Sequence, residues 1–175
     1  MIIALSGPAA SGKGTLARML ASHLNLPHYD FGLMFRAIAY SNFQIHFIEV
    51  KNGKIFFKGC DLTEAIKTEE VGLLATRMAH RLKDLEISLI RHTDFICDGR
   101  TCGTEIYPDA DFKFYITANK KERFDRRSKD DGDKEIMSQR EILDESRLMI
   151  PANAIVIDTS GKTKKESLRE ILSSL

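Results

Sequence analysis

Long apolar runs are missing from this chain of 175 residues. No stretch approaches the ~18 consecutive apolar residues that a membrane-spanning helix requires. The first ten residues, MIIALSGPAA, also lack the basic region that precedes the apolar run of a signal peptide. We therefore expect a soluble protein with no membrane anchor and no signal peptide. With 43% apolar and 29% charged residues, the chain is large enough to bury a core of its own.

Cysteine and net charge are also scarce. The three cysteines, Cys60, Cys97 and Cys102, are an odd number, and none lies in a Cys-x-x-Cys pair. We therefore expect free thiols and a cytoplasmic location. Cys97 lies inside an apolar run and is interpreted as a small core residue, with a redox role for Cys97 and Cys102 as the alternative. The formal net charge of +1 argues against a general nucleic-acid surface.

Short apolar segments alternate with segments of helical periodicity along the chain. The predicted strands are residues 2–6, 94–98, 111–117 and 154–160. The predicted helices are residues 16–24, 62–92, 118–128, 138–149 and 164–175, and residues 28–43 form a turn that leads into a helix. Alternating apolar residues around Asn52-Gly53 predict a β-hairpin. Strands that alternate with helices indicate an α/β fold with a parallel sheet covered on both faces, into which the hairpin is inserted.

The clearest motif is the glycine-rich loop GPAASGKGT between the first predicted strand and the first predicted helix. Its spacing, Gly-x-x-x-x-Gly-Lys, lets backbone N–H groups and a helix N-terminus form a cradle for phosphates. Lys13 can reach the outer phosphates as a point charge. Gly14 stands between Lys13 and Thr15, where the strict pattern has Ser or Thr directly after the lysine. The alternative is a glycine-rich turn that only packs a helix on a sheet.

Asp98 ends an apolar predicted strand in the segment FICDGRTCGTE. Ligands of a doubly wound sheet bind at the carboxyl ends of its strands, so Asp98 is expected beside the glycine-rich loop. An acid in that place can hold Mg²⁺, directly or through water, against the β- and γ-phosphates of a nucleotide. We assign Asp98 and Thr15 to such a Mg²⁺ site. The alternative for Asp98 is a helix cap or a turn residue.

Charged residues follow two helical segments in the second half of the chain. Arg140, Asp144 and Arg147 recur at i, i+4 and i+7, which places them on one helix face. They form either a group that faces phosphates or a ladder of surface ion pairs of little energetic weight. The basic helix before them carries Arg123, Arg126 and Arg127. Either one of these arginines enters the site, or all three form a solvated face.

Several segments together resemble the bacterial cytidylate kinase family, whose members phosphorylate CMP and dCMP with ATP. The segments are GPAASGKGT, DGRTCGTEIYPDADFKFYITA, KERFDRR, and REILDESR followed by NAIVIDTS. The resemblance runs nearly end to end and implies a P-loop kinase fold in a single domain, 1–175. It implies a parallel core at 1–35, 93–127 and 153–175, a monophosphate-binding insertion at about 36–92, and a lid at about 128–150.

The resemblance also assigns roles to individual residues. The residues that bind ATP would be Gly7, Pro8, Ala9, Ala10, Ser11, Gly12, Lys13, Gly14 and Thr15. The catalytic residues would be Lys13, Arg100, Arg140 and Arg147. The acceptor would be bound by Arg36, Thr76, Arg100, Asp144 and Arg147. Of these, Arg36 would grip the acceptor phosphate, Asp144 the sugar, and Thr76 would lie near the pyrimidine. We expect ATP and Mg²⁺ as cofactors and small nucleotides as the only partners of a monomer, without nucleic acid or membrane.

The chain departs from the family pattern at four positions. Phe31 and Phe35 replace residues that carry hydroxyls near the acceptor phosphate. Leu85 and Thr101 replace an arginine and an acid that, by analogy with the family, read cytosine. The insertion and the lid are also shorter than in the family. A kinase for UMP or another monophosphate, and a nucleotide-binding protein without transfer activity, therefore remain as alternatives.

Overall fold

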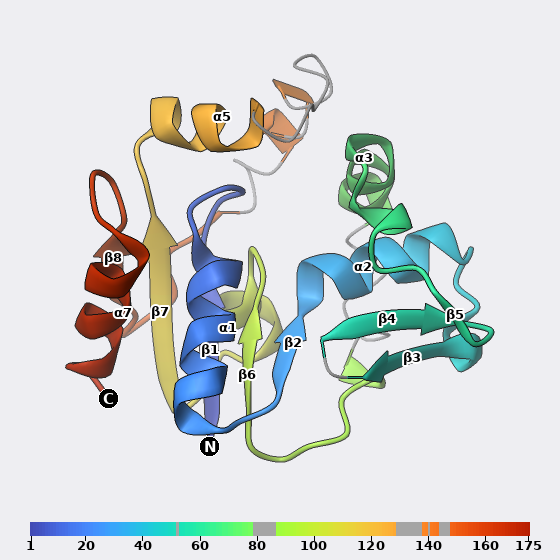
Figure 1. Ribbon diagram of the computed structural model, residues 1–175, viewed down its shortest axis with the longest axis horizontal. Coiled ribbons are helices and arrows are strands. Elements are labelled where there is room, and N and C mark those ends of the chain that lie inside the picture. The colour runs from blue at the N-terminus through green and yellow to red at the C-terminus, as the bar shows by residue number, and fades with distance from the viewer. Residues whose placement is uncertain (52, 79–86, 129–137, 140, 144–147) are drawn as a thin grey trace.

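The computed structural model (Figure 1) describes the whole chain of 175 residues except residues 52, 79–86, 129–137, 140 and 144–147. Its centre is a sheet of five parallel strands in the order β2-β6-β1-β7-β8. The strands are β1 (Ile2–Ser6), β2 (His28–Asp30), β6 (Phe95–Asp98), β7 (Phe112–Thr117) and β8 (Ile155–Asp158). The parallel sheet flanked by helices confirms the predicted α/β fold.

The edge strand β2 contradicts the predicted turn at the start of residues 28–43. It pairs with β6 in register, with His28 beside Ile96 and Asp30 beside Asp98. A strand of three residues is too short for its alternation of buried and partly exposed side chains to be recognised in the sequence. The other four strands of the sheet lie within the predicted ranges.

Apolar residues cover both faces of this sheet. The helices around it are α1 (Lys13–Leu24), α2 (Phe31–Tyr40), α5 (Lys120–Ser128), α7 (Lys164–Leu172) and the π-helical turn η4 (Cys102–Ile106). On one face, Ile3 and Leu5 of β1 pack with α1 and α7. On the other face, Ala4 packs with α2 and η4. The alternation of these three residues shows that the strand is buried on both sides, as a parallel sheet requires.

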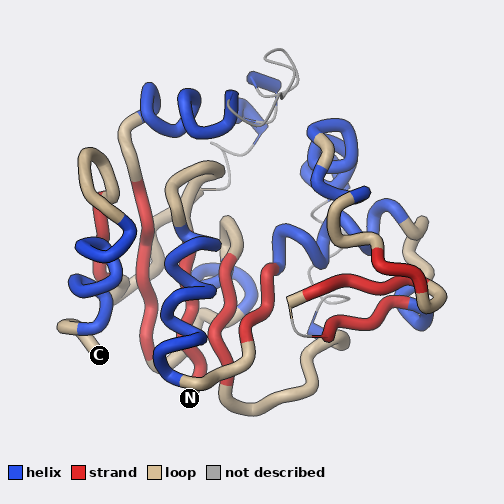
Figure 2. Tube along the Cα trace, in the orientation of Figure 1, coloured by secondary structure: helices blue, strands red, loops and turns tan. Residues whose placement is uncertain are grey.

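A second, antiparallel sheet lies beside the main one. It consists of β3 (Ile48–Lys51), β4 (Lys54–Phe57) and β5 (Cys60–Asp61). The pairing of Lys51 with Lys54 confirms the predicted hairpin around Asn52-Gly53, although Asn52 itself lies outside the described residues. Figure 2 shows the two sheets with α2 between them, and α2 packs against both.

The helix predicted for residues 62–92 is interrupted in the part that the structure describes, and its residues 79–86 lie outside the described residues. Residues 65–67 form a 3-10 turn and α3 extends over Glu69–Met78. Thr68 precedes α3, and its Oγ1 accepts a long hydrogen bond of 3.4 Å from the N–H of Val71, so this residue separates the two segments. Residues 88–92 are not helical. Of the helix predicted for residues 138–149, residues 138–139 and 141–143 are helical and residues 148–150 are not.

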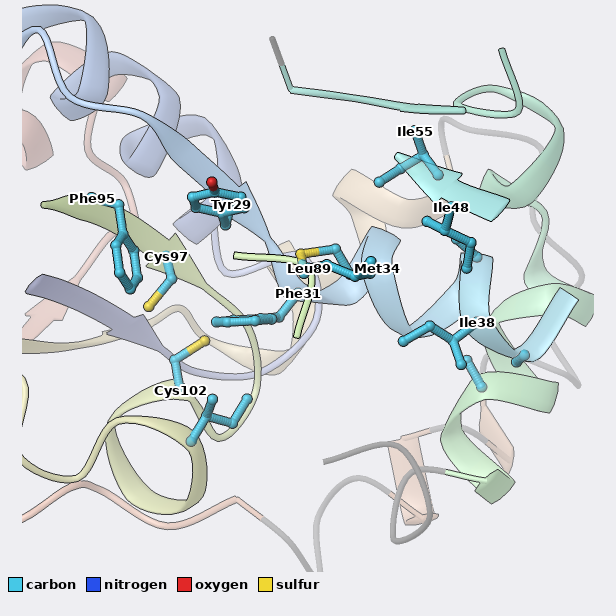
Figure 3. Packing of buried hydrophobic residues seen from close by; sticks show 14 of the residues in the cluster. Tyr29, Phe31, Met34, Ile38, Ile48, Ile55, Leu89, Phe95, Cys97 and Cys102 are labelled. Carbon is cyan, nitrogen blue, oxygen red and sulfur yellow. The ribbon is translucent and has the colours of Figure 1, made fainter. Parts of the chain in front are cut away.

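The buried core on the α2 side continues from the main sheet into the antiparallel sheet (Figure 3). Phe31, Cys97 and Cys102 lie together beside the main sheet, while Ile38 of α2 faces Ile48 of the hairpin. Cys97 and Cys102 are free and fully buried, which confirms Cys97 as a core residue, and Cys60 is free and exposed. Among the described residues, no helix has both the length and the apolar character needed to cross a membrane.

Candidate active site

The glycine-rich loop connects β1 to α1 (Figure 1). It lies at the end of the sheet where the carboxyl ends of the parallel strands are found. Three residues of the loop have positive φ angles: Gly7 at 140°, Ala10 at 58° and Gly12 at 93°. A Cβ on Gly7 would lie 2.1 Å from the carbonyl oxygen of Ile116 in β7, so only glycine fits there. The conformation of the loop therefore depends on the close contact of Gly7 with β7 as well as on the turns within the loop.

Three side chains hold consecutive carbonyl groups of this loop from outside. Arg123 Nη1 donates to the Ala9 oxygen at 3.3 Å and Arg126 Nη1 to the Ala10 oxygen at 3.2 Å. Thr159 Oγ1 donates to the Ser11 oxygen at 2.8 Å. In a trans peptide the N–H points opposite to the carbonyl oxygen, so each contact turns the following N–H group away from the side chain that holds the carbonyl. The N–H of Ser11 donates to the Pro8 carbonyl oxygen at 3.4 Å, so these contacts fix a turn within the loop.

The contacts with the loop carbonyls show what two arginines of the basic helix α5 do. Arg123 and Arg126 both support the loop backbone. Arg123 is 11% exposed and also pairs with the buried Glu141, whereas Arg126 is 34% exposed and thus partly solvated. Sequence reasoning did not single out Thr159. Thr159 and Ser11, which this hydrogen bond joins, are 148 positions apart in the chain. No local sequence motif predicts a contact over such a separation.

We expect Gly7→Ala to lower the stability of the folded protein by about 3 kcal/mol or more, because the added Cβ would clash with the backbone of β7 at a φ angle that other residues rarely adopt. For a chain of this size the melting temperature should fall by roughly 6–12 °C. Thermal unfolding followed by circular dichroism measures it. Gly161→Ala is the matched control, because Gly161 has a φ of 66° and nothing within 4 Å of an added Cβ. Equal losses in both variants would contradict the steric argument.

Lys13 lies at the start of α1 and is partly buried beside the loop. Its Nζ donates to the Pro8 carbonyl oxygen at 3.1 Å. Burial lowers the pKa of Lys13; the negative charge of Asp98 opposes this shift and the positive charge of Arg100 adds to it. A bound phosphate would supply the negative charge that stabilises this ammonium group.

Asp98 ends β6 beside the loop, as predicted, and is 3% exposed. In the register of the sheet it lies next to Asp30. Burial raises the pKa of Asp30, and the negative charge of Asp98 raises it further. The buried Asp98 and the partly buried Asp30 therefore lie in adjacent positions close to Lys13, and together they favour the binding of another cation.

Most of the predicted site residues that the structure describes line one cavity of about 1830 Å³. The predicted residues on its wall are Ala9, Ala10, Gly12, Lys13, Gly14, Thr15, Arg36, Thr76, Asp98 and Arg100. The loop and Asp98 form one wall, and α2 and α3 form the other. Arg36 Nη1 donates to the carbonyl oxygens of Ile66 and Thr68 at 2.8 and 2.9 Å, which fixes this arginine against the segment before α3.

The hydroxyl of Thr76 donates to the Gly72 carbonyl oxygen one turn earlier in α3, at 2.9 Å. Its oxygen remains an acceptor on the cavity wall. The cavity also reaches Thr159, Lys162 and Lys164 after β8, which sequence reasoning did not single out. The only signal for them was their position at the end of a predicted strand or just after it, because ligands bind at the carboxyl ends of such strands.

Part of the predicted site falls outside the described residues. Arg140, Asp144 and Arg147 are among these, as is Leu85. Of the other departures, Phe31 is fully buried, and its ring lies 6.1 Å from that of Tyr107, so its side chain belongs to the core.

Phe35 and Thr101 both line the cavity. Thr101 is 2% exposed and caps the turn η4, and its carbonyl oxygen accepts from the N–H of Glu105 at 2.9 Å.

Known proteins similar to this chain are cytidylate kinases. A family model described as cytidylate kinase matches residues 3–175. The cytidylate kinase of Thermotoga neapolitana is 32% identical over 209 aligned positions, which cover 97% of this chain and 94% of the relative. That of Clostridioides difficile is 31% identical over 211 positions, covering 100% and 98%. Both alignments are longer than the chain, so the relatives have segments that this chain lacks.

Solved structures show the same fold at low sequence identity. TT1252 from Thermus thermophilus matches with a TM-score of 0.54 and 17% identity, over 99% of this chain and 95% of that protein. A sugar kinase from Janibacter sp. HTCC2649 matches with a TM-score of 0.51 and 15% identity, over 98% and 92%. At these identities the likeness concerns the fold alone.

Proposed function

Because the chain belongs to the cytidylate kinase family, we propose that it transfers the γ-phosphoryl group of ATP to CMP and dCMP, which yields CDP and dCDP. The observation that carries this proposal for the site is the convergence of Lys13, Asp98 and Arg100 on one cavity, whose opposite wall carries Arg36 and Thr76. A cavity with cations on both walls can bind two phosphate groups and hold them facing each other.

The acceptor needs no general base in this reaction. The second pKa of a phosphate monoester is near ~6, so a nucleoside monophosphate is largely a dianion at neutral pH. Its oxygen is already a nucleophile. The chain's own residues therefore act by position and charge: the loop N–H groups and Lys13 bind the donor phosphates, Arg36 orients the acceptor phosphate, and Arg100 neutralises charge between them.

The residues at the end of β6 fit a Mg²⁺ ion that binds together with ATP. Mg²⁺ is usually held by one or two carboxylates, several waters and the phosphates of the substrate. Among the described residues, no group of three or more His, Cys, Asp or Glu side chains is arranged to hold a metal ion. The two adjacent acids Asp30 and Asp98 match the one or two carboxylates that are usual for Mg²⁺. Asp98 and Thr15 would hold the ion, which supplies positive charge to the β- and γ-phosphates.

The two walls of the cavity also support separate parts of the chain for the binding of the donor and of the acceptor. We assign the acceptor to the insertion at residues 36–92, since α2 and α3 carry Arg36 and Thr76. The roles of Arg140, Asp144 and Arg147 in a lid at about 128–150 stay predictions from the family resemblance.

The test is the release of ADP from Mg-ATP in the presence of CMP, dCMP, UMP, AMP or no acceptor. We expect fast release with CMP and dCMP only. Fast release with UMP or AMP instead would assign the chain to another acceptor. No acceptor-dependent release, together with tight binding of ATP, would identify a nucleotide-binding protein that lacks transfer activity. Varying the concentration of CMP in the same assay gives the KM for CMP.

A further inference from the structure

A histidine at the start of β2 contacts the acid that we assign to the metal site. His28 Nε2 lies 2.7 Å from Asp98 Oδ1, and the two side chains are 9% and 5% exposed. An ionised carboxylate only accepts hydrogen bonds, so the imidazole N–H is the donor. A hydrogen bond to a charged group that is shielded from water is among the stronger polar contacts in a protein. This contact therefore fixes the orientation of the Asp98 carboxylate.

The sheet register explains why these side chains meet. Asp30 of β2 lies beside Asp98 of β6, and His28 lies two residues before Asp30. Side chains two residues apart in a strand point to the same face of the sheet. His28, Asp30 and Asp98 therefore share the face that is covered by α1, where the glycine-rich loop ends.

The two oxygens of Asp98 have different surroundings. Oδ1 accepts from His28. Oδ2 is the oxygen nearer to the first turn of α1, since it lies 3.4 Å from the position of a Cβ on Gly14, whereas Oδ1 lies 3.8 Å away. Gly14 is also the residue that separates Lys13 from Thr15. One oxygen is thus held by the histidine, and the other is the nearer one to Gly14, which lines the cavity.

Other charges near Asp98 would orient its carboxylate differently. Lys13 attracts it, and the adjacent Asp30 repels it. Without a donor on Oδ1, the balance of these two interactions would set the side-chain rotamer. His28 supplies a short, directional contact that neither charge provides.

We propose that His28 is a positioning residue, which holds Asp98 so that Oδ2 faces the Mg²⁺ of bound Mg-ATP. This inference rests on the proposed function, because it takes Asp98 as the residue that holds the metal. Groups that orient a metal-holding residue typically change metal affinity or activity by about 10- to 100-fold when they are replaced. The alternative is that His28 only contributes to packing and stability.

Two substitutions separate these roles. In His28→Gln the side-chain amide nitrogen is as many bonds from the backbone as Nε2, so it can reach Asp98 Oδ1. In His28→Asn the amide nitrogen is one bond closer to the backbone and falls short. Calorimetry should compare the binding of ADP with and without Mg²⁺. We expect His28→Asn to reduce the Mg²⁺-dependent gain in ADP affinity about tenfold or more, and His28→Gln to keep most of it.

Two controls define what counts as a specific effect. His92 makes a comparable contact with β2, since its Nδ1 lies 2.7 Å from the hydroxyl of Tyr29. Tyr29 alternates with His28 and Asp30 along β2 and so points to the other face of the sheet. Because the contact of His92 does not involve Asp98, we expect His92→Asn to leave the Mg²⁺-dependent gain unchanged. In an Asp98→Asn background, His28→Asn should have no further effect on the gain, because two residues that act through one contact are not additive.

The proposal is overturned by equal losses of affinity with and without Mg²⁺, or by an additive effect of His28→Asn and Asp98→Asn. It is also overturned when Mg²⁺ does not strengthen ADP binding to the unaltered protein. These measurements use no acceptor and follow no phosphoryl transfer. Failure of the acceptor assay therefore tests the proposed function separately from the role of His28.

Discussion

Replacing Lys13 with methionine should lower kcat/KM for phosphoryl transfer by about 10³-fold while the protein stays folded. The loss corresponds to about 4 kcal/mol of transition-state stabilisation, which is the usual cost of removing one well-placed electrostatic group from an active site. Methionine keeps most of the length and apolar volume of the lysine stem. Since burial lowers the pKa of Lys13 in the protein without bound phosphate, the ammonium group costs free energy there, and its removal should not lower the melting temperature.

Lys113 offers a matched control for this substitution. Like Lys13, it donates through Nζ to the carbonyl oxygen of a proline five residues earlier, Pro108, at 2.8 Å. It lies at the opposite end of the sheet strands, outside the cavity. Lys113→Met should leave the release of ADP unchanged. Near-normal turnover in Lys13→Met, with a normal melting temperature, would contradict the assignment of the glycine-rich loop as the donor site.

The loop and the strand that ends at Asp98 are predictable because their signals are local. The spacing of Gly7, Gly12 and Lys13 lies within one short segment that a strand precedes and a helix follows. The apolar residues before Asp98 indicate a buried strand, and the topology of parallel sheets then places its carboxyl end at the site. In both cases neighbouring residues in the sequence are neighbours in the structure.

The supports of the site are not predictable in this way. The contacts of Arg123, Arg126 and Thr159 with the loop carbonyls join residues 114 to 148 positions apart. His28 meets Asp98 only because β2 is a strand, and a strand of three residues carries no clear periodic signal. The direction of a side chain is also not visible in the sequence: Phe31, which replaces a family residue with a hydroxyl near the acceptor phosphate, is a core residue.

The second large effect is expected at Arg100, which follows β6 through Gly99. A Cβ on Gly99 would lie 2.9 Å from Cys102 Sγ and 3.2 Å from Phe31 Cβ, so the backbone turns tightly against the core at this point. This turn places Arg100 on the cavity wall. Its positive charge contributes to the lowered pKa of Lys13, as expected for two cations that lie near each other on the cavity wall.

Arg100→Ala should therefore lower kcat about 10³-fold, whereas the affinity for ADP alone changes much less, because the loop and Lys13 still bind the donor phosphates. Arg100→Lys should recover only part of the rate, since an ammonium group cannot bridge two phosphates as the planar guanidinium does. The exposed Arg91, whose Nη1 donates to the carbonyl oxygens of Ser88 and Ile90, provides the control variant Arg91→Ala, with unchanged kcat. A loss of ADP binding equal to the loss of kcat in Arg100→Ala would place Arg100 in the donor site instead. Binding that persists while transfer stops would show that this arginine acts on the phosphoryl group between the two nucleotides, a function that a protein selected only to bind nucleotide does not require.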